Sequence, residues 1–179
     1  MKPAALLGGA LAALLLAAAP GRAFDFEDAT AEAGIGFVHS NGAHGSKYVI
    51  ETVGAGAAFF DYDNDGDLDA YLVNGASVPG GPEGAKSRNA LYRNEGDGTF
   101  SEATAASGTG DTGYGMGCAA GDTDNDGDLE LYLANFGANV LYRNEGDGTF
   151  SDITAEAGVG DGRWGSSCAF ADIDLDGYA

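Results

Sequence analysis

The sequence has 179 residues, of which 44% are hydrophobic and 20% charged, and its net charge is −20. The hydrophobic share excludes a disordered polymer, and the acidic excess excludes a nucleic-acid-binding protein, because phosphate groups would be repelled. So many carboxylates oppose compaction unless a counter-ion neutralises them, which makes a metal ion the first expected partner. Two cysteines, in no CxxC or His-associated spacing, exclude a disulfide scaffold and a zinc module.

The first 23 residues have the pattern of a secretory signal peptide. Lys2 precedes an uncharged run rich in Ala and Leu, and Gly21 and Ala23 are the small residues of a cleavage site after Ala23. The densely apolar part is shorter than the ~20 residues that span a bilayer, and an uncleaved anchor is the alternative. We therefore expect residues 24–179 to be secreted or periplasmic, with no membrane span once the signal peptide is removed.

The chain after residue 23 is built from repeated units. Residues 54–69 align with residues 115–130, and a third copy begins at Gly165. Self-similarity at a period of about 50 residues indicates an architecture of stacked units. The predicted units lie at about 54–104 and 115–154, with a truncated unit at 165–179.

Two further motifs recur within these units. The ten residues Leu-Tyr-Arg-Asn-Glu-Gly-Asp-Gly-Thr-Phe occur at 91–100 and again, unchanged, at 141–150. The five residues Phe100–Thr104 return in related form at Phe150–Thr154, with an earlier echo at Phe26–Thr30. This last motif therefore also occurs before the first predicted unit.

The period of hydrophobic residues within a unit is that of β-strands. Short apolar strands are expected at Leu68–Val73 and Leu129–Ala134, and their burial on both faces suits sheets stacked between neighbours. Asn89–Asn94 and Thr99–Ala103 are expected to form a hairpin across Glu95–Gly98, whose two glycines allow positive φ. A strand of small residues before each acidic loop makes about four strands per unit.

Four strands in roughly 50 residues is the size of a β-propeller blade. Closed propellers have typically 4 to 8 blades, whereas residues 24–179 supply about three. We therefore predict an all-β fold, an incomplete β-propeller built from four-stranded blades with calcium loops, which forms the N-terminal part of a longer protein.

The first acidic loop has the residue spacing of a calcium-binding loop. Asp61, Asp63 and Asp65 occupy positions 1, 3 and 5, Gly66 allows a sharp turn at position 6, and Asp69 is at position 9. The alternating carboxylates converge on one point. Asp67, at position 7, is expected to contribute its backbone carbonyl. Hard oxygen ligands, six to eight in number, favour Ca²⁺ over Mg²⁺.

The second and third loops repeat this pattern with differences. The glutamate at position 9 of the second loop is one methylene longer than aspartate, which leaves direct ligation open there. The third loop ends before position 9, so weak binding is expected. The predicted ligands are Asp122, Asp124, Asp126, Asp128 and Glu130 in the second loop, and Asp172, Asp174 and Asp176 in the third.

The spacing of these loops has two alternative interpretations. An EF-hand requires a bidentate Glu at position 12 and flanking helices, but here position 12 is Leu72 or Leu133, within expected strands. Acidic surface turns without a metal are the other alternative. Aligned carboxylates in register with strands would repel one another without a cation, which favours calcium.

The units resemble the FG-GAP or VCBS repeats of integrin-α-type β-propellers. The block Phe37–Asp69, with His39, Asn41, Tyr48 and Glu51 before its loop, resembles the cartilage acidic protein family. This resemblance implies a propeller of seven blades, each with a calcium ion between its first two strands. It also implies a C-terminal domain of the ASPIC/UnbV type that this sequence does not include.

The expected function is that of a secreted calcium-binding propeller segment. Its partners are calcium and an extracellular protein or carbohydrate, bound in adhesion or scaffolding. No enzyme is expected, since neither a nucleophile motif nor a phosphate-binding loop is present. The alternatives are the propeller part of a larger secreted enzyme, with catalytic residues beyond residue 179, and a purely structural module.

The two cysteines occupy one repeat position. Cys118 and Cys168 align with Ala57 of the first unit, so a small residue packed in an inner strand explains both. Free thiols are expected, and a disulfide is the alternative.

Overall fold

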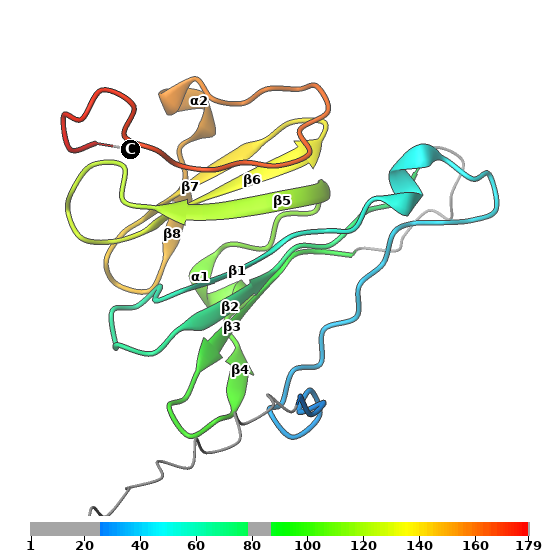
Figure 1. Ribbon diagram of the computed structural model, residues 1–179, viewed down its shortest axis with the longest axis horizontal. Helices are drawn as coiled ribbons and strands as arrows, with labels where there is room; N and C mark the ends of the chain where they lie inside the picture. The colour runs from blue at the N-terminus through cyan, green and yellow to red at the C-terminus, as the bar shows by residue number, and fades with distance from the viewer. Residues whose placement is uncertain (1–25, 79–86, 179) are drawn as a thin grey trace, which may run out of the picture.

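The structure is a computed structural model that describes residues 26–78 and 87–178. These residues form two four-stranded antiparallel sheets, one for each of the first two repeat units (Figure 1). The chain is therefore all-β, as predicted. The predicted signal peptide lies outside the described residues.

Both sheets are meanders with the strands in chain order. The first contains β1 (Ala57–Phe60), β2 (Asp69–Leu72), β3 (Ala90–Asn94) and β4 (Phe100–Glu102). The second contains β5 (Tyr114–Gly121), β6 (Glu130–Phe136), β7 (Val140–Asn144) and β8 (Phe150–Asp152). The predicted four strands per unit and the predicted hairpins are confirmed.

Within the described ranges three short helices accompany the sheets, and none of them was predicted. A 3-10 helix, η1 (Val49–Thr52), precedes β1, and the single-turn helices α1 (Thr104–Ser107) and α2 (Thr154–Ala157) follow the last strand of each sheet. Gly108 and Gly158 end α1 and α2 at φ of 81° and 70°, a left-handed conformation that glycine adopts without steric cost.

The main core lies between the two sheets. Tyr71 and Leu91 of the first sheet and Leu131 and Leu133 of the second are fully buried there. Burying one such side chain contributes roughly 1.5–3 kcal/mol. The opposite face of β2 is also buried, because Ala70 packs in a second cluster. The prediction that the strand is buried on both faces is therefore confirmed for β2, whereas Tyr132 on the second face of β6 is only half-buried.

The inner segments of successive units approach each other closely at one repeat position. A Cβ atom on Gly56 would lie 2.9 Å from the Cα atom of Gly117, and a Cβ atom on Gly117 would lie 3.3 Å from the Cα atom of Ser167. These three residues occupy one repeat position. The third unit therefore begins beside β5, as β5 lies beside β1.

The third unit forms no strand among the residues that the structure describes. A single bridge joins Phe136 to Trp164, and residues 165–171 carry no strand. In the complete units the first strand pairs along its length with the second, and the described ranges hold no such partner for residues 165–171. No helix within the described ranges is long and apolar enough to cross a bilayer.

Cys118 and Cys168 are both free and half-buried. Burial raises the pKa of the Cys118 thiol to about 12, which keeps it protonated and unreactive at neutral pH. We expect thiol titration of the non-reduced, denatured chain to find two free thiols. A count of zero in the monomer would show a disulfide and would contradict this arrangement.

Candidate metal sites

The three acidic loops share one backbone conformation. The residue at position 4 is left-handed in each, with φ of 58° at Asn64, 60° at Asn125 and 62° at Leu175. Position 6 is glycine, with φ of 94° at Gly66 and 96° at both equivalents. The predicted sharp turn at position 6 is confirmed. The left-handed position 4 was missed, although asparagine favours that conformation.

The loops lie side by side at one end of the molecule, at the left in Figure 1. The Asn64 side-chain amide donates a hydrogen bond to Asp128 Oδ1 of the second loop. The Asn125 amide in turn donates to the Gly177 carbonyl of the third loop. The same residue position thus links each loop to the next.

The first loop joins β1 to β2 and brings together Asp61, Asp63 and Asp69. One carboxylate oxygen of each lies within 4.8 Å of the other two. Asp69 is fully buried, and its two oxygens accept hydrogen bonds from the backbone N–H groups of Asn94 (2.8 Å) and Tyr62 (3.0 Å). Burial raises the pKa of the Asp69 carboxyl. Three carboxylates therefore converge on one point, and one of them is shielded from water.

The second loop brings together Asp122, Asp124 and Glu130 at the same spacing. Glu130 is the first residue of β6, as Asp69 is of β2, and it is fully buried. Its Oε2 accepts hydrogen bonds from the backbone N–H (2.7 Å) and hydroxyl (2.8 Å) of Thr123. Burial raises the pKa of the Glu130 carboxyl. The longer side chain thus takes the position of the aspartate in the first loop.

The third loop brings together Asp172, Asp174 and Asp176, which are more exposed. The backbone N–H of Gly177, above all, lowers the pKa of the Asp172 carboxyl. Among the described residues no position 9 exists here, so the cluster uses position 5 instead. The expectation of weaker binding at this loop stays a prediction.

Positions 5 and 7 of the first two loops lie outside the clusters. Asp65 Oδ2 accepts a hydrogen bond from Arg93 Nη2 at 3.1 Å, and the backbone N–H of Asp67 together with Arg93 lowers the pKa of the Asp65 carboxyl. Asp126 accepts a bond from the backbone N–H of Asp128 at 2.9 Å. The carboxylates at position 5 therefore accept hydrogen bonds that stabilise the loop conformation. Their spacing did not predict this role.

A basic residue distinguishes the first loop from the second. Arg93 Nε lies 2.9 Å from Asp63 Oδ2, so a guanidinium already offsets part of the charge of the first cluster. The equivalent Arg143 pairs instead with Glu145, at 3.0 Å. Among the described residues, no arginine therefore forms a direct ion pair with the second cluster.

The donor set fits a hard divalent cation. Three buried carboxylate oxygens in the first two loops have no hydrogen-bond partner, namely Asp63 Oδ1, Asp122 Oδ1 and Glu130 Oε1. The great majority of buried polar atoms in proteins have a hydrogen-bond partner, and a bound cation would satisfy these three. Carboxylate oxygens in a short irregular loop suit Ca²⁺. Two of the three belong to the second loop, which is the stronger candidate.

Comparison with protein-family models matches the FG-GAP-like repeat to residues 61–133 and 122–179. Each matched segment begins at the first aspartate of an acidic loop, and together they cover more than half of the chain. A search of the curated proteins found no match. The repeated four-stranded sheets and the loops between their first two strands agree with this match. The chain belongs to the family of proteins built from FG-GAP-like repeats.

Proposed function

We propose that this chain is part of a secreted, calcium-stabilised β-propeller that binds another macromolecule in adhesion or scaffolding. The observation that carries the proposal is the burial of carboxylates with unpaired oxygens at the start of β6, beside a loop repeated three times. Calcium is abundant outside cells, which agrees with the predicted signal peptide. The expected ligand is an extracellular protein or carbohydrate.

The stacking of the units supports the propeller. The second sheet covers Tyr71 and Leu91 of the first completely. Their equivalents in the second sheet, Tyr132 and Leu141, instead line an open apolar cavity of about 260 Å³, together with Phe170 at the start of the third unit. A third sheet stacked in the same way would fill this cavity. The units thus continue in one direction, as blades do.

The proposed role of calcium is structural. The clustered residues lie at the end of β1 and the start of β2, or at the end of β5 and the start of β6. A cation held between them would fix the connection between the two strands. It would also neutralise like charges that otherwise repel one another across a few ångströms. Calcium would therefore stabilise each sheet and the line of loops that links successive sheets.

Substitutions at single loop positions test this role. Asp124→Ala removes a cluster carboxylate, so we expect it to lower the melting temperature in calcium by several degrees and to have little effect in chelator. Asp63→Ala should also lower the melting temperature in calcium, but it removes the ion pair with Arg93 as well, so part of its effect should persist in chelator. Asp67→Asn is the matched control, because position 7 is expected to bind only through its carbonyl. Equal losses for Asp124→Ala in calcium and in chelator, measured by calorimetry, would contradict the proposal.

The binding role needs a separate test. An array of extracellular matrix proteins and glycans should retain the chain in calcium and release it in chelator. Release from the array without loss of folded structure would mean that calcium contacts the ligand directly and is not only structural. Absence of any retained ligand in calcium would count against a binding module.

A further inference from the structure

One arginine position of the repeat makes different contacts in the two complete units. Arg93 of β3 and Arg143 of β7 occupy the same place in the ten residues that occur unchanged at 91–100 and 141–150. Arg93 reaches across to the first acidic loop, whereas Arg143 turns to Glu145 of its own hairpin. Because the hairpin sequence around them is identical, the two units display two positions that this side chain can adopt.

In the first unit the guanidinium lies between two carboxylates of the loop. Arg93 Nε is 2.9 Å from Asp63 Oδ2, and Arg93 Nη2 is 3.1 Å from Asp65 Oδ2. Glu95 is more distant, with its Oε2 at 3.9 Å from Arg93 Nη1. Asp63 belongs to the first cluster of carboxylates. A positive charge therefore already lies at the edge of the first candidate metal site.

The contact between Arg93 and Asp63 is incomplete. Arg93 Nε is buried and has no hydrogen-bond partner in spite of the short distance to Asp63, and Asp63 Oδ1 has no partner either. The two groups therefore attract each other by charge without forming a hydrogen bond. The Arg93 side chain as a whole is 40% exposed, so no packing holds it against the loop.

The second position of the side chain is fully bonded. Arg143 Nε and Nη2 both donate to Glu145 Oε1, at 3.2 Å and 3.0 Å. The equivalent Glu95 is oriented in the same way as Glu145, because each accepts a hydrogen bond from the serine opposite, which is Ser101 in the first unit. An acceptor for Arg93 is therefore in place on its own hairpin.

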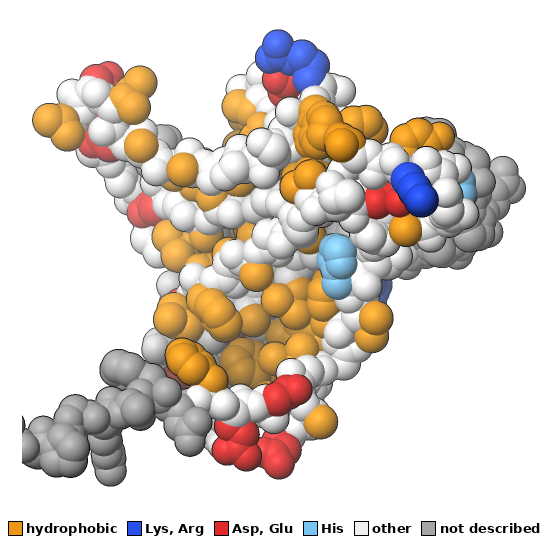
Figure 2. Space-filling view, turned by 45° about the vertical axis from the view of Figure 1, so that its right-hand side comes forward, with side chains coloured by type: hydrophobic (Ala, Val, Ile, Leu, Met, Phe, Trp, Pro, Cys, Tyr) orange, Lys and Arg blue, Asp and Glu red, His pale blue; other side chains and the backbone are white. Residues whose placement is uncertain are grey.

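Basic side chains are scarce in this chain, which has 8 Lys and Arg residues against 28 Asp and Glu residues. On the face seen in Figure 2, acidic side chains gather in several places where no basic side chain lies beside them. Among the described residues, Arg93 is the only arginine that forms an ion pair with a clustered carboxylate. A guanidinium remains charged at any pH near neutrality, so Arg93 offsets charge repulsion in the first loop.

We infer that Arg93 is a built-in counter-cation of the first acidic loop, and that it leaves Asp63 for Glu95 when a calcium ion binds there. Arg93 therefore stabilises the loop without metal and weakens its affinity for calcium, because the ion pair must be broken. The second loop has no such arginine and should fill at a lower calcium concentration. A partly exposed ion pair changes an equilibrium constant by up to about fivefold. The inference rests on the proposed calcium sites and adds a difference between them.

The test isolates the first loop with Asp124→Ala, which removes a carboxylate of the second cluster. In this background, Arg93→Gln should strengthen calcium binding by about fivefold, measured by calorimetric titration. Glutamine keeps hydrogen-bonding capacity and removes the charge. Arg143→Gln in the same background is the matched control and should leave the affinity unchanged, because Arg143 pairs with Glu145. The third loop is the same in every chain, so the difference reports the first loop.

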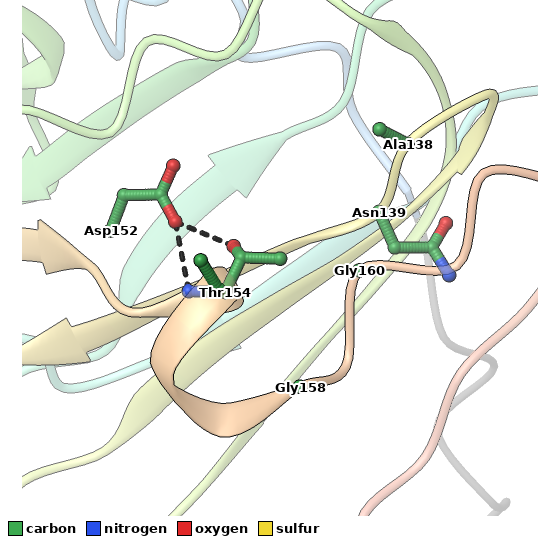
Figure 3. A pocket seen from close by; sticks show the side chains of 7 residues that line it. Ala138, Asn139, Asp152, Thr154, Gly158 and Gly160 are labelled. Carbon is green, nitrogen blue, oxygen red and sulfur yellow. Dashed lines mark hydrogen bonds between the residues drawn. The ribbon is translucent and has the colours of Figure 1, made fainter.

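A second arginine of the first unit provides a further control. Arg88 Nη2 lies 2.8 Å from Glu102 Oε1, and neither residue belongs to a cluster. The second unit has Ala138 and Asp152 at these positions, and Asp152 accepts hydrogen bonds from Thr154 instead (Figure 3). That unit folds without this ion pair. Arg88→Gln should therefore leave the calcium affinity of the first loop unchanged.

Melting temperatures give a second readout. In chelator, Arg93→Gln should lower the melting temperature more than Arg143→Gln does, because only Arg93 offsets a cluster. In saturating calcium the two variants should melt at nearly the same temperature, because each then lacks only a pair with a glutamate of its own hairpin.

Unchanged calcium affinity in the Arg93→Gln chain would overturn the inference. A loss of affinity would overturn it as well, because Arg93 would then hold Asp63 in place for the metal. An equal gain from Arg143→Gln or Arg88→Gln would show a general effect of charge and would also overturn it. If the unaltered chain bound no calcium, the proposed calcium sites would fail, and the inference would fail with them.

Discussion

Removing calcium is expected to lower the melting temperature of residues 24–179 by roughly 10–20 °C. A metal that binds only the folded state contributes about 2.7 kcal/mol per site at a hundredfold excess over its Kd. Two sites therefore contribute about 5 kcal/mol, and one kcal/mol shifts the melting temperature of a chain of this size by about 2–4 °C. Calorimetry in calcium and in chelator measures the difference.

Magnesium provides the control for ionic strength and charge screening. It requires near-ideal octahedral geometry and gives up water reluctantly, so magnesium in place of calcium should recover only a small part of the stability. Equal melting temperatures in calcium and in chelator would mean that the acidic loops fold without a cation.

Glu130→Gln is expected to change stability in opposite directions with and without calcium. In chelator the buried carboxylate has an unpaired oxygen beside Asp122 and Asp124. The amide removes that charge, and leaving a buried polar group unsatisfied costs about 1–3 kcal/mol, more for a charge. The melting temperature should therefore rise in chelator. In calcium the same change removes a charged ligand, so the melting temperature should fall.

The pH dependence of this effect follows from the raised pKa of Glu130. In chelator the folded chain holds the Glu130 proton more tightly than the unfolded chain, whose pKa is near the ordinary value of 4.5. Stability from this group is therefore fully present below pH 4.5 and is lost as the pH rises through the folded pKa. The advantage of Glu130→Gln in chelator should accordingly vanish below pH 4.5 and grow toward neutral pH.

The exposed Glu156 of α2 offers the matched control for this substitution. Glu156→Gln changes the net charge by the same amount at an exposed residue outside the cluster, so its effect should be small and equal in both media. If Glu130→Gln lowered the melting temperature equally in calcium and in chelator, its carboxylate would be structural and not a ligand.

The repeat explains why so much of the fold followed from the sequence. The hairpin strands β3 and β7 were predicted because one ten-residue sequence, with the same glycine turn, occurs in both units, at 91–100 and at 141–150. The helices α1 and α2 were missed because a single turn carries no helical periodicity. Their Thr-Ala-x-x-Gly pattern, three times present, was the available signal.

The clustering of the carboxylates at positions 1, 3 and 9 of the first two loops was predictable from the loop spacing, and the different place of position 5 was not. The spacing of a calcium loop places Asp65 among the ligands, but Arg93, from a strand 28 residues later, draws its carboxylate away. Asp69 is likewise held by the backbone of Asn94 on β3. Such contacts depend on how β2 and β3 pair, and the loop sequence alone does not contain that information.

The number of calcium ions bound per chain tests the central claim most directly. Equilibrium dialysis should find two tightly bound ions in the unaltered chain, with weaker binding at the third loop. Asp124→Ala should leave one tight site, and Asp63→Ala combined with Asp124→Ala should leave none. If the unaltered chain bound no calcium tightly, the account would be contradicted. Tight binding that remained in the double variant would also contradict calcium sites in the first two acidic loops.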